Sequence, residues 1–231
     1  MSLRTTYSDL GQDRWIIDDV FASLIAEGYK GFFIEAGAAT GTDASNTFLL
    51  EKQHGWTGVL VEPNVYFFDI LQKNRQSKCF NVVLSDSDGE LDFIQAGYRG
   101  VAPDHVRAVF DKRGLDMRSH PPYQQDADGT PATETALPAL TLRTLLDRIE
   151  APETIDYFSL DVEGGELAVL KGFPFERRRI RALTIETLFP SGARTVEHDH
   201  RAACHELLTE HGYSLVKTLS YDDCYMHRDF M

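Results

Sequence analysis

Four short segments of the chain carry glycines, acidic side chains or histidines whose types and spacing could do chemistry. The first is Glu35–Gly41 (EAGAATG), in which two glycines are separated by three residues. Glycines at a turn between a strand and a helix let the backbone approach a ligand closely, and in open α/β sheets such ligands lie beyond the carboxyl ends of the strands. The spacing differs from GxGxxG and better suits a ligand without a pyrophosphate. A purely structural turn is the alternative.

The second segment ends in Glu62, which follows the apolar stretch TGVLV. A carboxylate at the end of such a strand can accept hydrogen bonds from both hydroxyls of a ribose. The acid argues against a 2′-phosphate, but it does not discriminate NAD from S-adenosylmethionine. A solvated carboxylate at a strand end is the alternative interpretation.

The third segment is Asp161–Glu166 (DVEGGE). The strand before it is expected to lie beside the strand that precedes the glycine-rich turn, so that Asp161 would face the ligand cleft. A carboxylate there can contact the amino acid part of a cofactor, orient a nucleophile or bind a metal. Glu166 is expected in the first turn of the following helix, where its charge favours the helix dipole.

The fourth segment places His198 and His200 after the fifth expected strand. Imidazole is a plausible base near neutral pH, although polar residues at the start of a helix are the alternative. Together with Asp161 and Glu186 the histidines would form a mixed oxygen and nitrogen set that suits Mg, Mn or Zn. A Mg or Mn site on Asp161 and Glu186 is therefore an option, but not the favoured one.

The elements that must position these residues alternate between strand and helix patterns. That alternation predicts βαβ units and a parallel sheet. The expected helices cover residues 13–27, 43–54, 65–75, 142–149, 165–172 and 197–211, and the expected strands 31–37, 57–63, 78–85, 155–161, 180–186, 214–219 and 224–228. The final two strands are joined without a helix, so they must be antiparallel. Residues 89–96 are expected to add one strand of a small hairpin beside the sheet.

Residues 97–138 break this alternation. They contain His120-Pro121-Pro122 and Thr130-Pro131 with little periodicity. A stretch this long without a regular pattern is usually functional or mobile. We expect an insertion before the fourth strand that covers the substrate, and a disordered surface excursion is the alternative.

Composition bounds the class of protein. The 231 residues fit one α/β domain over 1–231, with an N-terminal helical segment over 1–30. A formal net charge of -13 argues against nucleic acid as a partner. The three cysteines are far apart and form no CxxC pair, which argues against disulfides and a zinc knuckle. No signal peptide or membrane-length apolar run is evident, so we expect a cytoplasmic protein with no membrane contact.

Several stretches together resemble the FkbM family of methyltransferases. They are residues 31–64, which include the SNT after the glycine-rich turn and the EPN block, residues 155–173 with DVEG, and the ending 211–228. The segment YSDLGQD at 7–13 is also similar. The resemblance covers nearly the whole chain except residues 97–138. It implies a doubly wound, Rossmann-like class I methyltransferase sheet of seven strands with the last strand antiparallel. It also implies S-adenosylmethionine as cofactor and O-methylation of a small molecule or sugar hydroxyl, or of a carboxylate.

The resemblance also implies site residues, carried over by position. Those implied around the cofactor are Glu35, Gly37, Ala38, Gly41, Ser45, Asn46, Glu62, Pro63, Ser85, Asp86 and Asp161. Asp161 would stand at the reaction centre, and Glu163, His198 and His200 are further candidates for the base. Thr40 departs from the family's commoner acid or asparagine at that place, which leaves the contacts to the amino acid end of the cofactor open.

Two other functions stay open on sequence grounds. A nicotinamide oxidoreductase is disfavoured by the absence of GxGxxG. A non-catalytic interaction protein on the same fold is the other alternative, because fold does not fix function. We expect a small-molecule acceptor as the partner, and the sequence leaves a homo-oligomer open.

Overall fold

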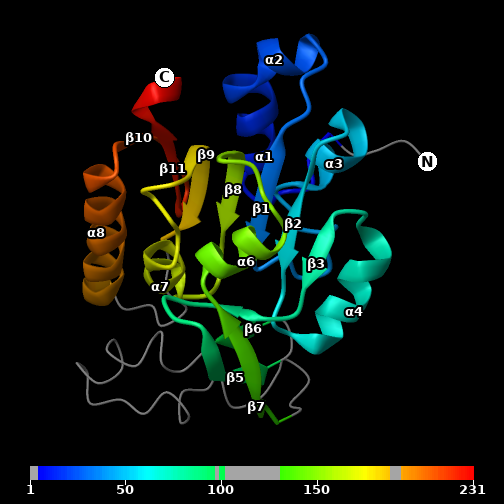
Figure 1. The fold of residues 1–231 in the computed structure, drawn as a ribbon, viewed down its shortest axis with the longest axis vertical. Coiled ribbons are helices and arrows are strands. Elements are labelled where there is room, and N and C mark those ends of the chain that lie inside the picture. Colours follow the sequence, from blue (N-terminus) through cyan, green and yellow to red (C-terminus); the bar gives the residue numbers. More distant parts are fainter. Residues whose placement is uncertain (1–4, 97–98, 102–130, 188–193) are drawn as a thin grey trace.

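A seven-stranded sheet with helices on both faces forms the body of the protein (Figure 1). The computed structural model describes residues 5–96, 99–101, 131–187 and 194–231. The strand order is β10-β11-β9-β8-β1-β2-β3. In chain order these strands are β1 Phe32–Ala36, β2 Thr57–Val61, β3 Lys78–Phe80, β8 Thr154–Leu160, β9 Arg179–Glu186, β10 Tyr213–Leu219 and β11 Asp222–His227.

Strand β11 is antiparallel to both of its neighbours, β9 and β10. The other neighbouring strands of this sheet, β9, β8, β1, β2 and β3, pair in parallel. β10 and β11 are joined by a tight turn at Ser220, which has φ 57°. So short a connection can only form an antiparallel pair. The doubly wound sheet of seven strands with the last one antiparallel, expected from the sequence, is confirmed.

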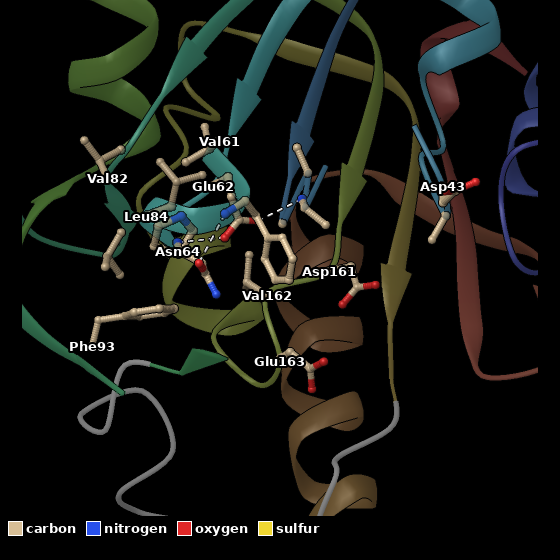
Figure 2. A pocket seen from close by; sticks show the side chains of 17 residues that line it. Asp43, Val61, Glu62, Asn64, Val82, Leu84, Phe93, Asp161, Val162 and Glu163 are labelled. Atoms are coloured by element: carbon tan, nitrogen blue, oxygen red, sulfur yellow. Dashed lines mark hydrogen bonds between the residues drawn. The ribbon is translucent and has the colours of Figure 1, made fainter. Parts of the chain in front are cut away.

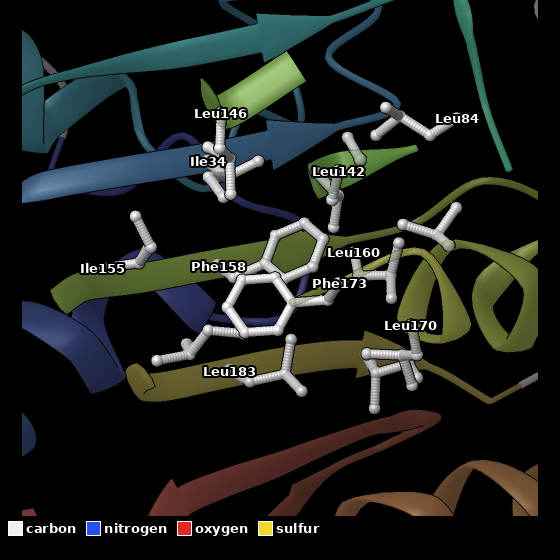
Figure 3. Packing of buried hydrophobic residues seen from close by; sticks show 14 of the residues in the cluster. Ile34, Leu84, Leu142, Leu146, Ile155, Phe158, Leu160, Leu170, Phe173 and Leu183 are labelled. Carbon is white, nitrogen blue, oxygen red and sulfur yellow. The ribbon is translucent and has the colours of Figure 1, made fainter. Parts of the chain in front are cut away.

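Adjacent residues of β1 bury their side chains in different clusters on opposite faces of the sheet. Ile34 belongs to a cluster on one face that also contains Leu146, Phe158 and Leu170 (Figure 3). Phe33 packs on the other face. Because successive side chains of a strand point to opposite sides, a central strand that is apolar throughout needs helices on both faces.

The helices divide between these two faces. Helices α6 Leu142–Arg148, α7 Glu166–Lys171 and α8 Arg194–Glu210 contribute to the cluster around Ile34. Helices α3 Phe48–His54 and α4 Val65–Asn74 contribute to the cluster around Phe33, together with the N-terminal segment. That segment was predicted as one helix over 13–27. It consists of α1 Gln12–Arg14, a π-helical turn Trp15–Val20 and α2 Ala22–Ala26, and it ends at Gly28 as expected. A 3-10 turn, Arg228–Phe230, follows β11.

The helix expected over 43–54 begins only at Phe48. Ala44 takes a left-handed backbone, with φ 63°, and so cannot belong to the helix. Ser45 and Thr47 instead direct their hydroxyls to the carboxylate of Glu35. The side chains before the helix therefore hold the glycine-rich loop in place.

A second sheet lies beside the carboxyl ends of the first. Its order is β4-β7-β5-β6, with β4 Val83–Leu84, β5 Gly89–Ala96, β6 Arg99–Val101 and β7 Thr133–Leu140. The single strand expected over 78–85 is therefore two strands in different sheets. Residues 133–138, expected within the irregular insertion, form most of β7 and pair antiparallel with β5. Residues 99–101 of that insertion form β6, which also pairs antiparallel with β5, and residues 97–98 and 102–130 lie outside the described residues.

In the part of the chain that the structure describes, no helix is long and apolar enough to cross a membrane.

Gly37 directly follows β1 and lies against Asp161, the residue that directly follows β8. Its φ is 81°, and a Cβ added there would lie 1.7 Å from the carbonyl oxygen of Asp161. The sequence assigns this glycine to the approach of a ligand, and the backbone of the adjacent strand end is a second reason why no side chain fits there. Gly28 has nearly the same φ, 83°, but nothing lies within 4 Å of its added Cβ.

Alanine substitutions at Gly28 and Gly37 separate the cost of a left-handed backbone from the cost of the close approach to Asp161. Gly28→Ala should cost about 1–2 kcal/mol of unfolding free energy, the penalty of a left-handed alanine. Gly37→Ala should cost about 1–3 kcal/mol more, because the loop and the end of β8 must move apart. Urea denaturation of the two variants measures the difference. Equal costs would show that the contact between Gly37 and Asp161 imposes no constraint.

Candidate functional site

A cavity opens beyond the carboxyl ends of β1, β2 and β8, and Figure 2 shows its lining. It measures about 950 Å³, including the part that is open to solvent. The loop after β1 contributes Gly37, Ala38 and Ala39 to the wall, and the end of β2 contributes Glu62. The small sheet closes one side with Phe93 from β5. The cavity thus lies where parallel α/β sheets bind their ligands.

Glu62 is the buried carboxylate in this wall, with 6% of its surface exposed. Its Oε2 accepts a hydrogen bond from the Ala39 amide at 2.8 Å, and its Oε1 accepts one from the Asn64 amide at 2.7 Å. Burial raises the pKa of Glu62 to about 7, although the two amide bonds act in the opposite direction. Each carboxylate oxygen keeps capacity for a further donor, because a carboxylate has about four acceptor positions.

Arg75 holds the glycine-rich loop from behind the cavity. Its side chain is fully buried, and Nη1 lies 3.2 Å from both Glu35 Oε2 and the carbonyl oxygen of Gly41. Nη2 donates to Thr47 Oγ1 at 2.9 Å. The Nε atom lies 3.3 Å from Glu51 Oε1, an ion pair without hydrogen-bond geometry. One guanidinium therefore connects β1, the loop and α3.

The other wall carries a pair of acids. Asp161 follows β8 and is exposed to the cavity, and its carboxyl group shares a hydrogen bond with that of Glu186 at the end of β9. The pKa of each carboxyl is raised, first because the surrounding protein keeps bulk water away. Asp161 raises the pKa of Glu186 further, whereas the hydrogen bond with Glu186 lowers that of Asp161, and the nearby charges of Glu163 and Glu166 raise both. Two carboxyl groups this close share one proton more readily than they both ionise.

Glu163 also faces the cavity, next to Asp161 (Figure 2). The opposite end of the cavity is apolar, with Val82 and Leu84 beside Phe93 (Figure 2). Thus one cavity combines an acidic end, an apolar end and a buried carboxylate in its wall.

Comparison with known proteins identifies the family to which these features belong. Residues 35–215 match the methyltransferase FkbM domain. The chain belongs to the FkbM methyltransferase family. A comparison with curated proteins finds no match.

Solved structures show similar chains at low identity. An FkbM methyltransferase from Methylobacillus flagellatus is 14% identical with a TM-score of 0.48, and the match covers 86% of this chain and 44% of that one. The present chain thus spans less than half of that protein. A magnesium protoporphyrin IX methyltransferase from Synechocystis, solved with bound S-adenosylhomocysteine, is 13% identical with a TM-score of 0.40 and coverages of 98% and 90%.

The FkbM domain brings only some of the expected cofactor residues to the cavity. Those in its lining are Gly37, Ala38, Glu62, Pro63 and Asp161. Glu35, Ser45 and Asn46 are buried behind the loop and bind one another, with Arg75 beside them. Their contacts support the loop and do not reach the cavity wall.

Three further expected residues lie away from the lining. Gly41 packs against Leu71 and Arg75, where an added Cβ would lie 2.4 Å and 2.8 Å from their side-chain atoms. Ser85 is buried and donates its amide to Leu140 at 3.0 Å, and Asp86 is exposed. Sequence reasoning missed Arg75 and Phe93 because nothing local marks them. Asn64 carried a signal, since it caps α4 through bonds from Tyr66 and Phe67.

The structure describes the side chain of one of the two candidate histidines. His200 lies on α8, and its Nε2 is 2.9 Å from Glu166 Oε2. His198 is also on α8, but its side chain lies outside the described residues. Among the described residues, no group of three or more His, Cys, Asp and Glu side chains could hold a metal ion. The proposed ligands Asp161 and Glu186 form the hydrogen-bonded pair described above.

The role of Arg75 can be measured through stability. Arg75→Met removes one partner of a buried ion network and leaves Glu35 and Glu51 uncompensated, which should cost about 3–5 kcal/mol of unfolding free energy. Arg14→Met is the matched control. Its partner Asp18 is about half exposed, so the loss should be at most about 1 kcal/mol. Chemical denaturation gives both values. Similar small losses would mean that the buried network does not hold the loop.

Proposed function

We propose that this FkbM-family chain is an S-adenosylmethionine-dependent methyltransferase that methylates a hydroxyl group, or a carboxylate, of a small molecule or sugar. The observation that carries the proposal is Glu62. It is a buried carboxylate in the cavity wall, at the end of β2 and next to the glycine-rich loop. Such a group is suited to bind the two hydroxyls of a ribose.

The two ends of the cavity suit the two ends of that cofactor. Val82, Leu84 and Phe93 offer an apolar surface for a flat purine ring. Asp161 offers negative charge for the sulfonium, which S-adenosylhomocysteine lacks, and Glu163 offers it for the ammonium group. Opposite charges a few ångströms apart attract by about 4 kcal/mol where the effective dielectric constant is about 20. The acids therefore favour a cation in this half of the cavity.

The bound cofactor supplies an activated methyl group, so the protein mainly positions the acceptor and removes its proton. Asp161 is the group placed to take that proton, and Glu186 shares it through the hydrogen bond between them. A nearby cation favours the carboxylate form and so lowers the pKa of Asp161 from its raised value. This brings it toward the range in which a general base works best. A base in this position suits a methyl acceptor that must lose a proton, such as an alcohol.

Calorimetry tests the cofactor assignment directly. S-adenosylhomocysteine and S-adenosylmethionine should bind the purified chain, and NAD should not. Transfer of labelled methyl groups to a panel of hydroxyl-bearing metabolites then tests the acceptor class. Binding of NAD alone would overturn the proposal. Transfer only to amines would retain the methyltransferase but reject O-methylation.

Glu62→Gln should weaken binding of S-adenosylhomocysteine at least tenfold. Hydrogen bonds to a charged group contribute about 1.5–3 kcal/mol each, and about 1.4 kcal/mol is a factor of ten. Glu90→Gln, an exposed residue on β5, should bind as the unaltered chain does. An unchanged dissociation constant in Glu62→Gln would contradict the ribose assignment.

The pH dependence gives an independent check of Glu62. Its pKa is raised to about 7, so the protonated fraction grows as the pH falls below that value. The neutral form accepts weaker hydrogen bonds, and affinity for S-adenosylhomocysteine should therefore fall between about pH 8 and pH 6. The Glu62→Gln variant has no proton to gain there and should lack that part of the pH dependence. An identical pH dependence in both proteins would assign it to another group.

Asp161→Asn preserves the shape of the side chain and removes the charge. Turnover with an acceptor found in the panel should fall about 10²–10⁴-fold, the range for general-base assistance, while affinity for S-adenosylhomocysteine changes only a few-fold. Single-turnover kinetics ensure that the chemical step is measured. Unaltered single-turnover rates would remove Asp161 from the reaction.

A further inference from the structure

The loop that carries the acidic end of the cavity has an unfavourable backbone. Glu163 has φ 57° and Gly164 has φ 105°. A residue other than glycine in the left-handed region is strained, because its Cβ crowds the following carbonyl oxygen. Such a conformation persists only where surrounding contacts hold it. The contacts that hold this loop therefore decide where Asp161 and Glu163 are placed.

Two sets of contacts fix the loop. At its start, the Asp161 amide donates to the carbonyl oxygen of Ala36 on β1 at 3.1 Å. Further on, Glu166 Oε1 accepts hydrogen bonds from the amides of Val162 at 3.1 Å and Gly164 at 3.0 Å. Glu166 is the first residue of α7, and its side chain is only 2% exposed. Its carboxylate thus folds back over the loop that precedes its own helix.

The other oxygen of this carboxylate is held from a different helix. Glu166 Oε2 lies 2.9 Å from His200 Nε2, and His200 is on α8, 34 residues later in the chain. The imidazole is 11% exposed. A carboxylate with both oxygens engaged cannot rotate without breaking bonds on one side. α8 thereby fixes the orientation of Glu166, and Glu166 fixes the loop.

From these contacts we infer that His200 is a positioning residue, which acts through Glu166 to hold the Asp161–Gly164 loop in the geometry needed at the cavity. Its Nε2 is engaged by Glu166, so its role differs from that of a base at the reaction centre. The inference rests on the proposed function for its catalytic meaning. The hydrogen-bond geometry stands without it.

Amide hydrogen exchange in two variants tests this chain of contacts. His200→Leu removes the donor to Glu166, and the amides of Val162 and Gly164 should exchange at least about tenfold faster. His200→Gln can restore a donor near the position of Nε2 and should stay within a few-fold of the unaltered chain. His205→Leu is the matched control, because His205 is exposed on the same helix and bonds to Tyr225 instead.

Amides of β8 serve as the internal reference for global unfolding. If His200→Leu speeds exchange at Phe158 as much as at Gly164, the effect is general destabilisation and the inference fails. It also fails if His200→Gln is as fast as His200→Leu, or if neither variant changes the loop.

Calorimetry keeps this inference separate from the proposed function. His200→Leu should bind S-adenosylhomocysteine several-fold more weakly, since Asp161, Val162 and Glu163 line the cavity, and His200→Gln should recover the affinity. If the unaltered chain binds no S-adenosylhomocysteine, the proposed function fails, while the exchange data still decide the role of His200. Unchanged affinity with a loosened loop would overturn the functional half of the inference.

Discussion

Arg75 carries a positive charge into the interior of the protein, and the shape of the cavity depends on how that charge is satisfied. The guanidinium lies between the rings of Phe33 and Phe48, 5.5 Å and 5.8 Å from their centroids, and pairs with Glu35 and Glu51. Isolated, such a charge would cost several kcal/mol to bury. The two carboxylates and the loop oxygens make it tolerable. These carboxylates and loop oxygens are thereby held in fixed positions around the planar guanidinium.

The same network accounts for an unusual balance at Glu51. Burial alone would raise its pKa, but Arg75 and hydrogen bonds from Ser77, Lys52 and Gln76 lower it to about 2. The pKa of Glu62 moves the other way, to about 7, because only backbone amides offset its burial. The acids that are paired with Arg75 therefore lie behind the loop, whereas Glu62, whose burial is offset only by backbone amides, lies at the cavity. That division suits structural support on one side and the binding of hydroxyl groups or cations on the other.

The acidic end of the cavity is built by elements far apart in sequence. β8 and β9 bring Asp161 and Glu186 together, and α8 reaches the loop through His200 and Glu166. The apolar end comes from a different source, since the small sheet supplies Phe93. Each end thus has its own supporting layer. A change in one layer can alter one half of the cavity without dismantling the main sheet.

Local pattern was sufficient for much of the fold. Apolar runs that end in acids or glycines marked β1, β2, β8 and β9, because buried parallel strands are apolar on both faces. The short link between β10 and β11 required an antiparallel pair. The same logic placed Glu62 and Asp161 at the sheet edge where the cavity lies, since parallel strands end together at one edge.

Other features depended on partners distant in the chain. The sequence could not show that Gly37 faces the carbonyl of Asp161, or that Glu35 is paired with Arg75 behind the loop. Nor could it show that residues 133–138 pair with β5 or that His200 binds Glu166. Periodicity reports which face of an element is buried. The partner that a buried polar group finds is decided only when the elements pack, because an unpaired buried charge costs more than any local preference supplies.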